Sequence, residues 1–464
     1  MKNVKMPPIP EILNKQREFF KTHTTQSVAF RKKSLLLLRD KLEAKEEEIC
    51  DALFQDFKKP KFESILTETA IVNKELKFTL KNIEKWAKPK KVKPSLLNFP
   101  SKDYIYSEPY GNVLIIAPWN YPYQLALAPL VNAIAAGNTV VLKPSELTPK
   151  TSRLIAEIIA EIFDPAHVTV VEGGVEESQQ LLAQKWDYIF FTGSVKVGKI
   201  VAKAAAEHLT PVTLELGGKN PCIIDETANI SLSAKRIVWG KFVNAGQTCI
   251  APDYVLIHKE VKEDFVNCLR KEIGLAYGEN PQESSDYARI INSSNYDRLT
   301  KMLKNESIAI GGITDVNTTY IAPTVIDEPN YLESEVMKDE IFGPILPIIS
   351  YMEENELAVI MNNYAKPLSL YIFSNRKKFI DIILKKFSFG GGTVNDTIIH
   401  FVNHRLPFGG VGESGIGAYH GRKSFDVFSH KKAIVKRGNW IDPPIRYAPY
   451  GTKINFIKKL LKWI

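Results

Sequence analysis

The sequence predicts an α/β protein with two doubly wound parallel-sheet domains and a small β excursion beside them. Apolar strand-like segments and helical segments alternate regularly from residue 112 to residue 216, and a second run of such segments follows residue 220. The chain has 464 residues, of which 44% are hydrophobic, and this is enough to build two cores of ordinary size.

The N-terminal part of the chain is expected to be helical. Apolar residues recur at helical spacing across residues 26–58, and a second helical pattern covers 63–87. The pattern breaks at 88–111, a segment with four prolines, a basic cluster and the alternating sequence DYIYSE. We expect this segment to form an extended excursion or hairpin outside the core.

The next region reads as a parallel sheet with helices on both faces. Its expected strands are near-continuous apolar runs: NVLIIA, TVVLK, VTVVEG, YIFFTG and PVTLEL. Ligands of such sheets bind beyond the carboxyl ends of the strands. The loops expected to carry function are therefore PWNYP (118–122), KPSE (143–146), EGG (172–174), TGS (192–194) and ELGGK (215–219).

Beyond residue 220 the pattern predicts a second α/β unit. Its strands are expected at YVLIH, IIN, LPIISY, SLYIFS and GGTVND, with a helix over 261–274. We place the domain boundary near residue 212. One domain then comprises 1–87 and 112–212, the other comprises 213–400, and the remaining segments, 88–111 and 401–464, bridge or extend them.

Positive charge is concentrated at the C-terminus. The last 34 residues contain nine Lys or Arg and one acid, so they carry +8 of the total +9. A nearly neutral body argues against a nucleic-acid groove. No apolar run approaches the ~20 residues of a membrane span, and the N-terminus lacks the apolar segment of a secretion signal, so a cytoplasmic location is expected.

The four cysteines, Cys50, Cys222, Cys249 and Cys268, form no C-x-x-C pair and are expected to be reduced. Three of them fall in helical or strand patterns and are expected to serve packing. Cys249 differs because it follows an apolar segment in the small-residue loop FVNAGQTCIAP. It is the candidate nucleophile, and because this loop contains no histidine, its proton acceptor must come from elsewhere.

Two glycine-rich segments are candidate phosphate sites. GVGESG (410–415) matches the dinucleotide pattern G-x-G-x-x-G, but the preceding NHRLPFG contains a proline and is not a buried strand, so we expect only a turn. FFTGSVKVG is the better candidate, because an apolar strand leads into Gly193 and Ser194 and then into a helix with Gly198. Such a turn aims backbone N–H groups at a phosphate.

His400 and His404 stand four residues apart and would share one face if their segment were helical. No third metal ligand stands nearby, and TIIHFVNHRLPFG reads as an extended or irregular segment. We therefore expect no metal site, and no histidine is placed to act as a base for Cys249.

Seven motifs, taken together, resemble the aldehyde dehydrogenase superfamily. APWNYP, VLKPSE, FTGS, LELGGKNP, NAGQTC, EIFGPILP and LPFGGVGESGIGAYHG occur in its order and spacing, over nearly the whole chain. The C-terminal part is most similar to the class 3 branch, which acts on medium-to-long aliphatic and aromatic aldehydes. The resemblance implies an aldehyde dehydrogenase-like fold with an NAD(P)-binding first domain and a catalytic second domain. It also implies a homodimer, in which 88–111 and KAIVKRG (432–438) could build the contact.

The resemblance implies a catalytic set of three residues: Cys249 as nucleophile, Glu215 as general base and Asn120 as oxyanion donor. The thiolate would add to an aldehyde, and the Asn120 amide and the backbone N–H of Cys249 would stabilise the oxyanion. Loss of hydride leaves a thioester, and a partly desolvated carboxylate suits the activation of water for its hydrolysis. Taken alone, Glu215 could be a strand-end cap and Asn120 a turn residue.

The cofactor implied by the resemblance is NAD, with NADP as an alternative. Its implied contacts are Trp119, Lys143, Glu146, Gly193, Ser194, Gly198, Glu340 and Phe342. In this pattern Glu340 and Phe342 hold the nicotinamide ribose and ring. Lys143 and Glu146 hold the adenosine ribose, and Ser194 contacts the pyrophosphate. A carboxylate at Glu146 favours NAD because it would repel a 2′-phosphate unless Lys143 offsets it.

Two alternatives keep the same fold. A coenzyme A-acylating aldehyde dehydrogenase would pass the acyl group to a thiol instead of water, but it has less need of a base such as Glu215. A non-catalytic binding or structural protein is the second alternative, and the intact motif residues argue against it.

The C-terminal sequence KINFIKKLLKWI predicts an amphipathic helix too short to span a bilayer. Lysines 458, 459 and 462 gather with Asn455 on one side, and only Lys453 is misplaced. The apolar side comprises Ile454, Phe456, Ile457, Leu460, Leu461, Trp463 and Ile464. Such a helix could bind an anionic membrane surface peripherally and so reach lipid-derived aldehydes. Alternatively, it packs on its own subunit or on a dimer mate.

Overall fold

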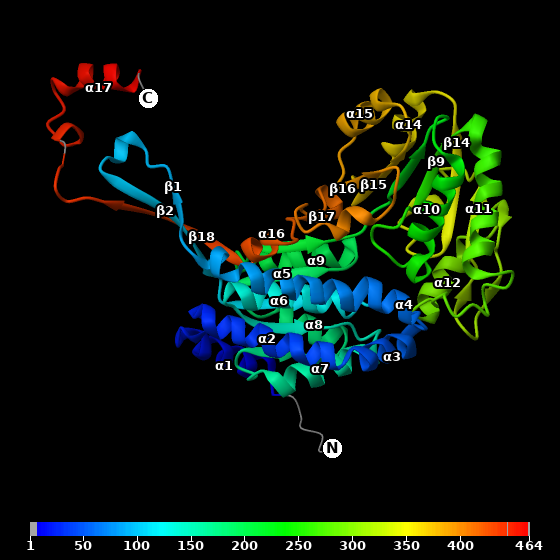
Figure 1. The fold of residues 1–464 in the computed structure, drawn as a ribbon, viewed down its shortest axis with the longest axis horizontal. Helices are drawn as coiled ribbons and strands as arrows, with labels where there is room; N and C mark the ends of the chain where they lie inside the picture. Colours follow the sequence, from blue (N-terminus) through cyan, green and yellow to red (C-terminus); the bar gives the residue numbers. More distant parts are fainter. Residues whose placement is uncertain (1–6, 443, 463–464) are drawn as a thin grey trace.

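Two helix-covered sheets and a projecting antiparallel sheet make up the fold (Figure 1). The structure is a computed structural model and describes residues 7–442 and 444–462. The two large sheets confirm the predicted pair of doubly wound domains, and the site lies between them.

The N-terminal segment forms a layer of helices, as predicted. These are α1 (Ile9–Lys21), α2 (Val28–Ala44), α3 (Glu46–Phe57), α4 (Lys61–Ser64), the π turn η2 (Ile65–Thr69) and α5 (Ala70–Ala87). The helix expected over 26–58 is broken at Lys45, whose backbone leaves the helical region with φ −106° and ψ 11°. Leu35, Leu38 and Leu42 are buried, which explains their helical spacing.

The first sheet has six strands in the order β17-β7-β6-β3-β4-β5. All of its pairs are parallel except that of β17 with β7. Its strands are β3 (Asn112–Ile116), β4 (Thr139–Lys143), β5 (Val168–Val170), β6 (Tyr188–Thr192), β7 (Val212–Glu215) and β17 (Gly415–Ile416). The helices of this unit are α6 (Gln124–Ala136), α7 (Pro149–Ile162), α8 (Val175–Leu182), α9 (Val195–Ala206) and α16 (Arg422–Val427).

The second sheet has seven strands in the order β10-β13-β14-β9-β8-β15-β16. They are β8 (Pro221–Ile224), β9 (Tyr254–His258), β10 (Ile308–Ile310), β13 (Thr324–Asp327), β14 (Ile345–Tyr351), β15 (Ser369–Phe373) and β16 (Gly391–Val394). A two-stranded sheet joins β11 (Thr314–Asp315) and β12 (Tyr320–Ile321). The helices are α10 (Ile230–Phe242), α11 (Lys262–Tyr277), α12 (Ser293–Lys301), α13 (Glu335–Lys338), α14 (Glu354–Met361) and α15 (Lys377–Lys386).

One strand of the second unit is predicted wrongly. The sequence IIN (290–292) is a loop, in which Asn292 caps α12 by accepting a hydrogen bond from the Asn295 N–H at 2.8 Å. A short apolar run cannot by itself distinguish a strand from a buried loop.

The sheets also correct the domain boundary expected at residue 212. Strand β7 belongs to the first sheet, because Phe191 pairs with Leu214 and Thr192 with Glu215. The chain enters the second sheet only at β8. Part of 401–464 also belongs to the first domain, because four of its aromatic side chains pack in the first core: Phe408, Tyr419, Phe425 and Phe428.

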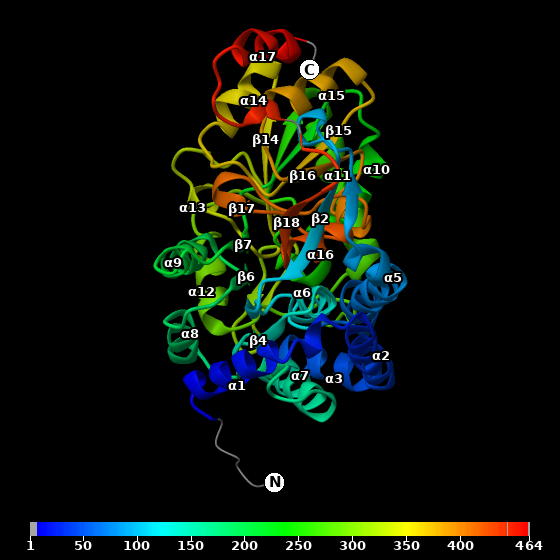
Figure 2. The same ribbon diagram turned by 90° about the vertical axis from the view of Figure 1, so that its left-hand side faces the viewer.

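The segment 88–111 forms the expected excursion. Strands β1 (Lys90–Val92), β2 (Ser101–Pro109) and β18 (Ser429–Arg437) make an antiparallel sheet, with β2 in the middle. This sheet projects from the two domains, and α17 (Lys453–Leu461) lies beyond it (Figures 1 and 2). Within the described ranges, no helix is both long and apolar enough to cross a membrane. Trp463 and Ile464 of the predicted tail helix lie outside the described residues.

Candidate active site

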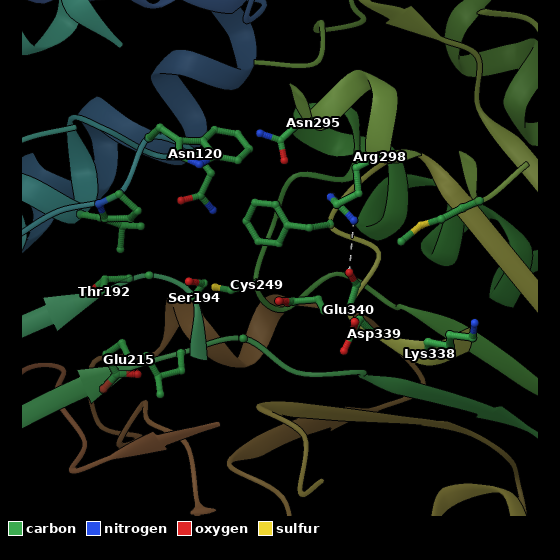
Figure 3. Close-up of a pocket in the computed structure, with 18 of the residues that line it drawn as sticks. Asn120, Thr192, Ser194, Glu215, Cys249, Asn295, Arg298, Lys338, Asp339 and Glu340 are labelled. Atoms are coloured by element: carbon green, nitrogen blue, oxygen red, sulfur yellow. Dashed lines mark hydrogen bonds between the residues drawn. The ribbon is translucent and has the colours of Figure 1, made fainter. Parts of the chain in front are cut away.

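The carboxyl ends of β3, β6 and β7 meet at one cavity of about 450 Å³. The turn after β3 supplies Trp119 and Asn120, β6 leads into Gly193 and Ser194, and β7 ends at Glu215 (Figure 3). The second domain completes the walls, and its contribution includes Cys249, Asn295, Arg298, Asp339, Glu340 and Phe342. The loops expected to bind ligands at 118–122, 192–194 and 215–219 therefore contribute to one site.

Cys249 follows a sharp backbone turn. Helix α10 ends at Phe242, and three consecutive residues then adopt left-handed conformations: Asn244 (φ 56°), Ala245 (φ 51°) and Gly246 (φ 73°). A Cβ atom on Gly246 would lie 2.3 Å from the carbonyl oxygen of Gly343, so this position requires glycine. The turn packs the loop before Cys249 against the segment that carries Phe342.

Asn220, in the ELGGKN segment, anchors the backbone at Cys249. Its side-chain Nδ2 donates to the carbonyl oxygens of Cys249 at 2.8 Å and Ala251 at 3.1 Å. Its Oδ1 accepts from the backbone N–H of Ser369 at 2.8 Å. One buried amide therefore links Cys249 to strand β15.

The thiol of Cys249 is protonated at neutral pH in the ligand-free protein. Burial, together with the nearby carboxyl groups of Glu340 and Glu215, raises its pKa to about 12, against the lowering by the backbone N–H groups of Cys249 and Ile250. Because the thiolate is the reactive form, the site must provide a proton acceptor.

Glu215 is a buried carboxyl group that lines the cavity together with Cys249. It ends β7 with only 3% of its surface exposed, and burial raises its pKa well above the ordinary value of 4.5. Neither carboxyl oxygen has a hydrogen-bond partner among the residues that the structure describes. An enclosed carboxyl without partners is a stronger base than one in water.

Asn120 is tied to the loop before Cys249 through its side chain and its backbone. Its Nδ2 donates to the carbonyl oxygen of Gln247 at 3.1 Å, and its backbone carbonyl oxygen accepts from Asn244 Nδ2 at 2.8 Å. The neighbouring Tyr121 hydroxyl lies 2.6 Å from Thr248 Oγ1. A primary amide has two N–H bonds, so one remains for a ligand after the bond to Gln247.

Five of the expected cofactor residues share the cavity with Cys249: Trp119, Gly193, Ser194, Glu340 and Phe342. The rings of Trp119 and Phe342 meet edge to face, with centroids 5.4 Å apart. Ser194 is the N-cap of α9, and its hydroxyl accepts from the Val197 N–H at 3.4 Å. Gly193 and Ser194 thus bring the N-terminus of a 12-residue helix to the cavity wall.

The other three expected cofactor residues lie outside the cavity lining. Lys143 is buried at the end of β4, where its Nζ donates to the Pro144 carbonyl at 2.8 Å and lies 3.5 Å from Glu146 Oε2. Burial lowers the pKa of Lys143. Gly198 faces Leu216, because an added Cβ would come within 2.6 Å of its Cδ2. This glycine allows α9 to pack closely on the residue after β7.

Glu340 has an unusual electrostatic setting. Burial raises its pKa to about 8, and the charge of Asp253 contributes, while the Gly218 N–H, Arg298 and Lys219 lower it. Arg298 donates to the Glu340 carbonyl at 3.5 Å, as Figure 3 shows. A Cβ on Gly217 would lie 2.1 Å from Glu340 Oε2, so the glycine makes room for this carboxyl group.

Sequence reasoning missed a buried ion pair that supports the site. Lys219 Nζ lies 2.7 Å from Asp253 Oδ2, and both side chains are 4% exposed. Lys219 also donates to the carbonyls of Val336 at 2.9 Å and Asp339 at 3.0 Å, while Asp253 Oδ1 accepts from the Ile341 N–H at 2.9 Å. The pair therefore joins the segment that follows Cys249 to the segment of Glu340. The sequence signal that could have indicated this ion pair is a charged residue close to the start of each of two apolar strands.

A second cavity of about 290 Å³ also reaches Cys249. It shares Leu125, Thr192, Glu215 and Leu216 with the first cavity. Its remaining wall is mainly apolar and comes from several separate parts of the chain, including Leu66, Ile71, Tyr121, Trp239, Ile250, Ile399, Phe401, Val402, Phe408 and Tyr419. Cys249 therefore stands where a cavity with several charged side chains meets one that is almost wholly apolar.

Comparison with known proteins identifies the family. The sequence model of the aldehyde dehydrogenase family matches residues 6–434. The chain belongs to the aldehyde dehydrogenase family. It is an NAD(P)-dependent oxidoreductase that acts on aldehydes, as the resemblance implied.

Its relatives include members of family 3, which confirms the class 3 resemblance. A 4,4'-diaponeurosporen-aldehyde dehydrogenase of Staphylococcus aureus is 47% identical over 448 residues, which cover 96% of this chain and 97% of the relative. Aldehyde dehydrogenase family 3 member B1 of Mus musculus is 45% identical, with 97% and 96% covered. A substrate-bound structure of Staphylococcus aureus AldH has a TM-score of 0.96 at 46% identity and covers 98% of this dehydrogenase and 100% of that chain.

The larger cavity of the dehydrogenase fits an NAD(P) cofactor. A helix N-terminus with Ser194 suits a diphosphate, and the Glu340 carboxyl, for which Gly217 leaves room, suits ribose hydroxyl groups. The aromatic pair of Trp119 and Phe342 offers apolar ring surface. These residues form a set that could hold the cofactor with Cys249 at its reactive end.

The histidines of the 399–404 segment serve structural contacts. The segment Ile399–Val402 is a 3₁₀ turn, so His400 and His404 do not share an α-helical face. His400 lies 3.3 Å from the hydroxyls of Ser369 and Thr393, and His404 Nδ1 lies 3.3 Å from Glu75 Oε2. Across residues 7–442 and 444–462, no cluster of three or more His, Cys, Asp or Glu side chains has a metal-binding arrangement.

Proposed function

We propose that Cys249, Glu215 and Asn120 are the catalytic residues of this dehydrogenase, and that its preferred substrates are medium- or long-chain aliphatic or aromatic aldehydes. The observation that carries the proposal is the position of Cys249 at the junction of the two cavities. A hydrophobic aldehyde would approach from the apolar side, and the cofactor from the polar side.

The reaction begins with proton transfer from the Cys249 thiol to the Glu215 carboxylate. Burial raises the pKa of both groups, so neither charge is stabilised by water and the proton can pass between them. The thiolate then adds to the aldehyde carbon. The free N–H bond of the Asn120 amide and the backbone N–H of Cys249 stabilise the oxyanion that forms.

Bound NAD(P) would supply a hydride acceptor, its nicotinamide ring, beside the thiohemiacetal at Cys249. Glu340 would hold the adjacent ribose, and Phe342 would orient the ring. Glu215 first releases to solvent the proton that it took from Cys249, and as a carboxylate it then takes a proton from the water molecule that attacks the thioester. The C–S bond breaks, the Cys249 thiolate is released, and the acid leaves. Hydrolysis requires this base, so the presence of Glu215 favours an acid product over a coenzyme A ester.

Two measurements test this mechanism. Cys249→Ser should abolish turnover and leave cofactor binding within about twofold of wild type, since the sulfur contributes to chemistry more than to ground-state binding. Cys268→Ser on α11 is the matched control and should keep full activity. NADH formation without coenzyme A is the second measurement, and a strict need for that thiol would contradict hydrolysis.

The apolar wall supports the proposed substrate class. Trp239, Phe401 and Val402 line the second cavity with apolar surface, so the cavity offers few groups that could hydrogen-bond to a polar chain. A relative with 47% identity is named for 4,4'-diaponeurosporen-aldehyde, so that aldehyde belongs in the test panel. Across unbranched aldehydes, kcat/KM should rise about threefold to fourfold per methylene until the cavity is filled, since burying one CH₂ stabilises by ~0.8 kcal/mol. A profile without chain-length dependence would contradict the assignment.

We also propose that NAD is preferred over NADP. Glu146 lies beside Lys143 at the end of β4, where a carboxylate could accept hydrogen bonds from a ribose 2′-hydroxyl and would repel a 2′-phosphate. Some use of NADP is expected because Lys143 offsets part of that repulsion. The ratio of kcat/KM values for the two cofactors decides this, and a ratio in favour of NADP would reverse the proposed role of Glu146.

A homodimer with a peripheral membrane contact is the proposed assembly. The projecting sheet of β1, β2 and β18 offers a surface for a second subunit. Beyond it, α17 exposes Ile454, Phe456 and Leu461 beside Lys458 and Lys459. Lys453, the one lysine on the apolar side, is held by the carbonyls of Pro444 and Tyr447. These features suit the cytoplasmic face of an anionic membrane.

Light scattering and vesicle binding test the assembly. A monomer at micromolar concentration would contradict the dimer. Full-length enzyme should co-sediment with anionic vesicles at low salt and less at high salt, whereas a chain ending at Tyr450 should not. Equal, negligible binding by both chains would favour a tail packed on protein.

A further inference from the structure

Glu63 reaches the nucleophile loop from a distant part of the chain. It lies on α4, where the N-terminal helical layer meets the second domain (Figure 1). One of its carboxyl oxygens, Oε2, accepts a hydrogen bond from the backbone N–H of Asn244 at 2.9 Å, although 181 residues separate the two. This N–H begins the left-handed turn that leads to Cys249.

The Asn244 N–H depends on a partner from outside its own segment. The residue is fully buried, and the chain has just left α10, so its backbone is no longer in a helical conformation. Left-handed backbone costs a non-glycine residue roughly 1 kcal/mol, so the surrounding contacts must hold this turn in place. Asn244 Nδ2 contributes by donating to Asn120 and Gln247, at 2.8 and 3.2 Å. Glu63 supplies the acceptor for the backbone.

The carboxyl group of Glu63 has no other hydrogen-bond or ion-pair role in the part of the chain that the structure describes. Lys59, whose charge lowers the pKa of Glu63, is already paired with Glu68 at 2.7 Å, and both of those side chains are fully buried. Burial, with a contribution from Asp286, raises the pKa of Glu63 from 4.5 to about 7, against the lowering by Lys59 and the Asn244 N–H. The position of Glu63 therefore opposes ionisation and costs stability as pH rises from about 4.5 to about 7.

We propose that Glu63 is a positioning residue of the dehydrogenase. By accepting the hydrogen bond from the Asn244 N–H, it fixes the conformation of the turn, and this turn determines the positions of both Cys249 and the Asn120 amide. Asn244 joins the two, because its backbone leads to the nucleophile and its side chain holds the carbonyl oxygen of Asn120. This role rests on the proposed function of Cys249 and extends it to a residue that touches neither substrate nor cofactor.

The test compares Glu63→Leu, which removes the acceptor, with Glu63→Gln, which keeps an acceptor oxygen. Glu63→Leu should lower kcat about tenfold or more and slow alkylation of Cys249 by iodoacetamide, because misplacing a reacting group by ~1 Å can cost ~100-fold. The KM for NAD should stay within about twofold, since the cofactor contacts are unchanged. Glu63→Gln should recover most of the lost kcat.

The matched control is Glu47→Gln, because Glu47 belongs to the same helical layer but is 73% exposed and pairs with Lys61. It should behave as wild type. Cys249→Ser is measured in parallel, and turnover by that variant would overturn the proposed function itself. Wild-type kcat in Glu63→Leu, or a Glu63→Gln enzyme as slow as Glu63→Leu, would overturn the role of Glu63.

Folding is checked separately by NAD titration and circular dichroism. If Glu63→Leu does not fold, Glu63→Ala is judged by the same criteria. Hydrogen exchange then gives a readout on the wild-type enzyme: the Asn244 amide should exchange slowly at pH 8, and rapid exchange there would overturn the hydrogen bond on which the proposal depends.

Discussion

Asp253→Asn should destabilise the dehydrogenase and weaken cofactor binding together. The substitution keeps an acceptor for the Ile341 N–H but leaves the Lys219 ammonium, only 4% exposed, without its counter-ion. Removing one member of a buried ion pair costs about 3–5 kcal/mol, because the remaining charge stays desolvated. Lys219 also contacts the carbonyls of Val336 and Asp339, next to Glu340. A displaced Lys219 should therefore disturb the segment that carries Glu340.

The size of the effect follows from the chain length. Unfolding entropy is about 2.1 cal/mol/K per residue, or ~1 kcal/mol/K for a chain of 464 residues that unfolds as one unit, so the melting temperature should fall by ~3–5 °C. The double variant Lys219→Met with Asp253→Leu should recover most of this loss, since apolar side chains of similar volume replace the pair. Removing the negative charge of Asp253 should also lower the pKa of Glu340.

Differential scanning calorimetry and NAD titration measure both effects. The matched control is Glu413→Gln, which breaks the Lys199–Glu413 pair, whose side chains are 65% and 53% exposed. An exposed pair contributes about 0–1 kcal/mol, so the control should shift the melting temperature by less than ~1 °C. An Asp253→Asn shift no larger than that of the control would refute the reasoning, as would a double variant less stable than either single one.

Three further outcomes are expected. Glu215→Gln should lower kcat by about 100-fold or more and slow the alkylation of Cys249, because the proton acceptor is lost; stopped-flow NADH formation measures this, and near-wild-type turnover would exclude Glu215 as the base. Gly217→Ala should raise the KM for NAD about tenfold, since its Cβ would lie 2.1 Å from Glu340 Oε2 and must displace that carboxyl group; an unchanged KM would show that the carboxyl position is unimportant. Because the pKa of Glu340 rises from 4.5 to about 8 on folding, stability of the ligand-free enzyme should fall as pH rises through this window. Glu340→Gln should flatten that part of the pH–stability curve while matching wild type near pH 4, where both side chains are neutral.

The positions of the candidate catalytic residues could be predicted from local patterns. Apolar strands that alternate with helices form a parallel sheet, and this predicted that Asn120, Ser194 and Glu215 stand at strand ends on one edge. Cys249 stood out because it follows an apolar segment in a small-residue loop. The structure brings all four to the larger cavity.

Local patterns were less informative where a segment's partner lies far along the chain. Strand β7 belongs to the first sheet because of its pairing with β6, and this pairing is invisible in the strand's own sequence. Likewise, Lys143, Glu146 and Gly198 belong to the right loops and helix but do not line the cavity, because packing decides which way the Lys143 and Glu146 side chains point and seats Gly198 against Leu216.

The sequence by itself determined the class of fold, the family and the residue types that carry the chemistry, because strand and helix periodicity and motif order are properties of short stretches of chain. Only the tertiary structure decided how those residues are held and charged. Glu63 meets Asn244 across 181 residues, Lys219 meets Asp253 in a buried pair, and Glu340 raises the pKa of Cys249 from another segment. Burial and contact set these energies, and both exist only once distant parts of the chain have packed together.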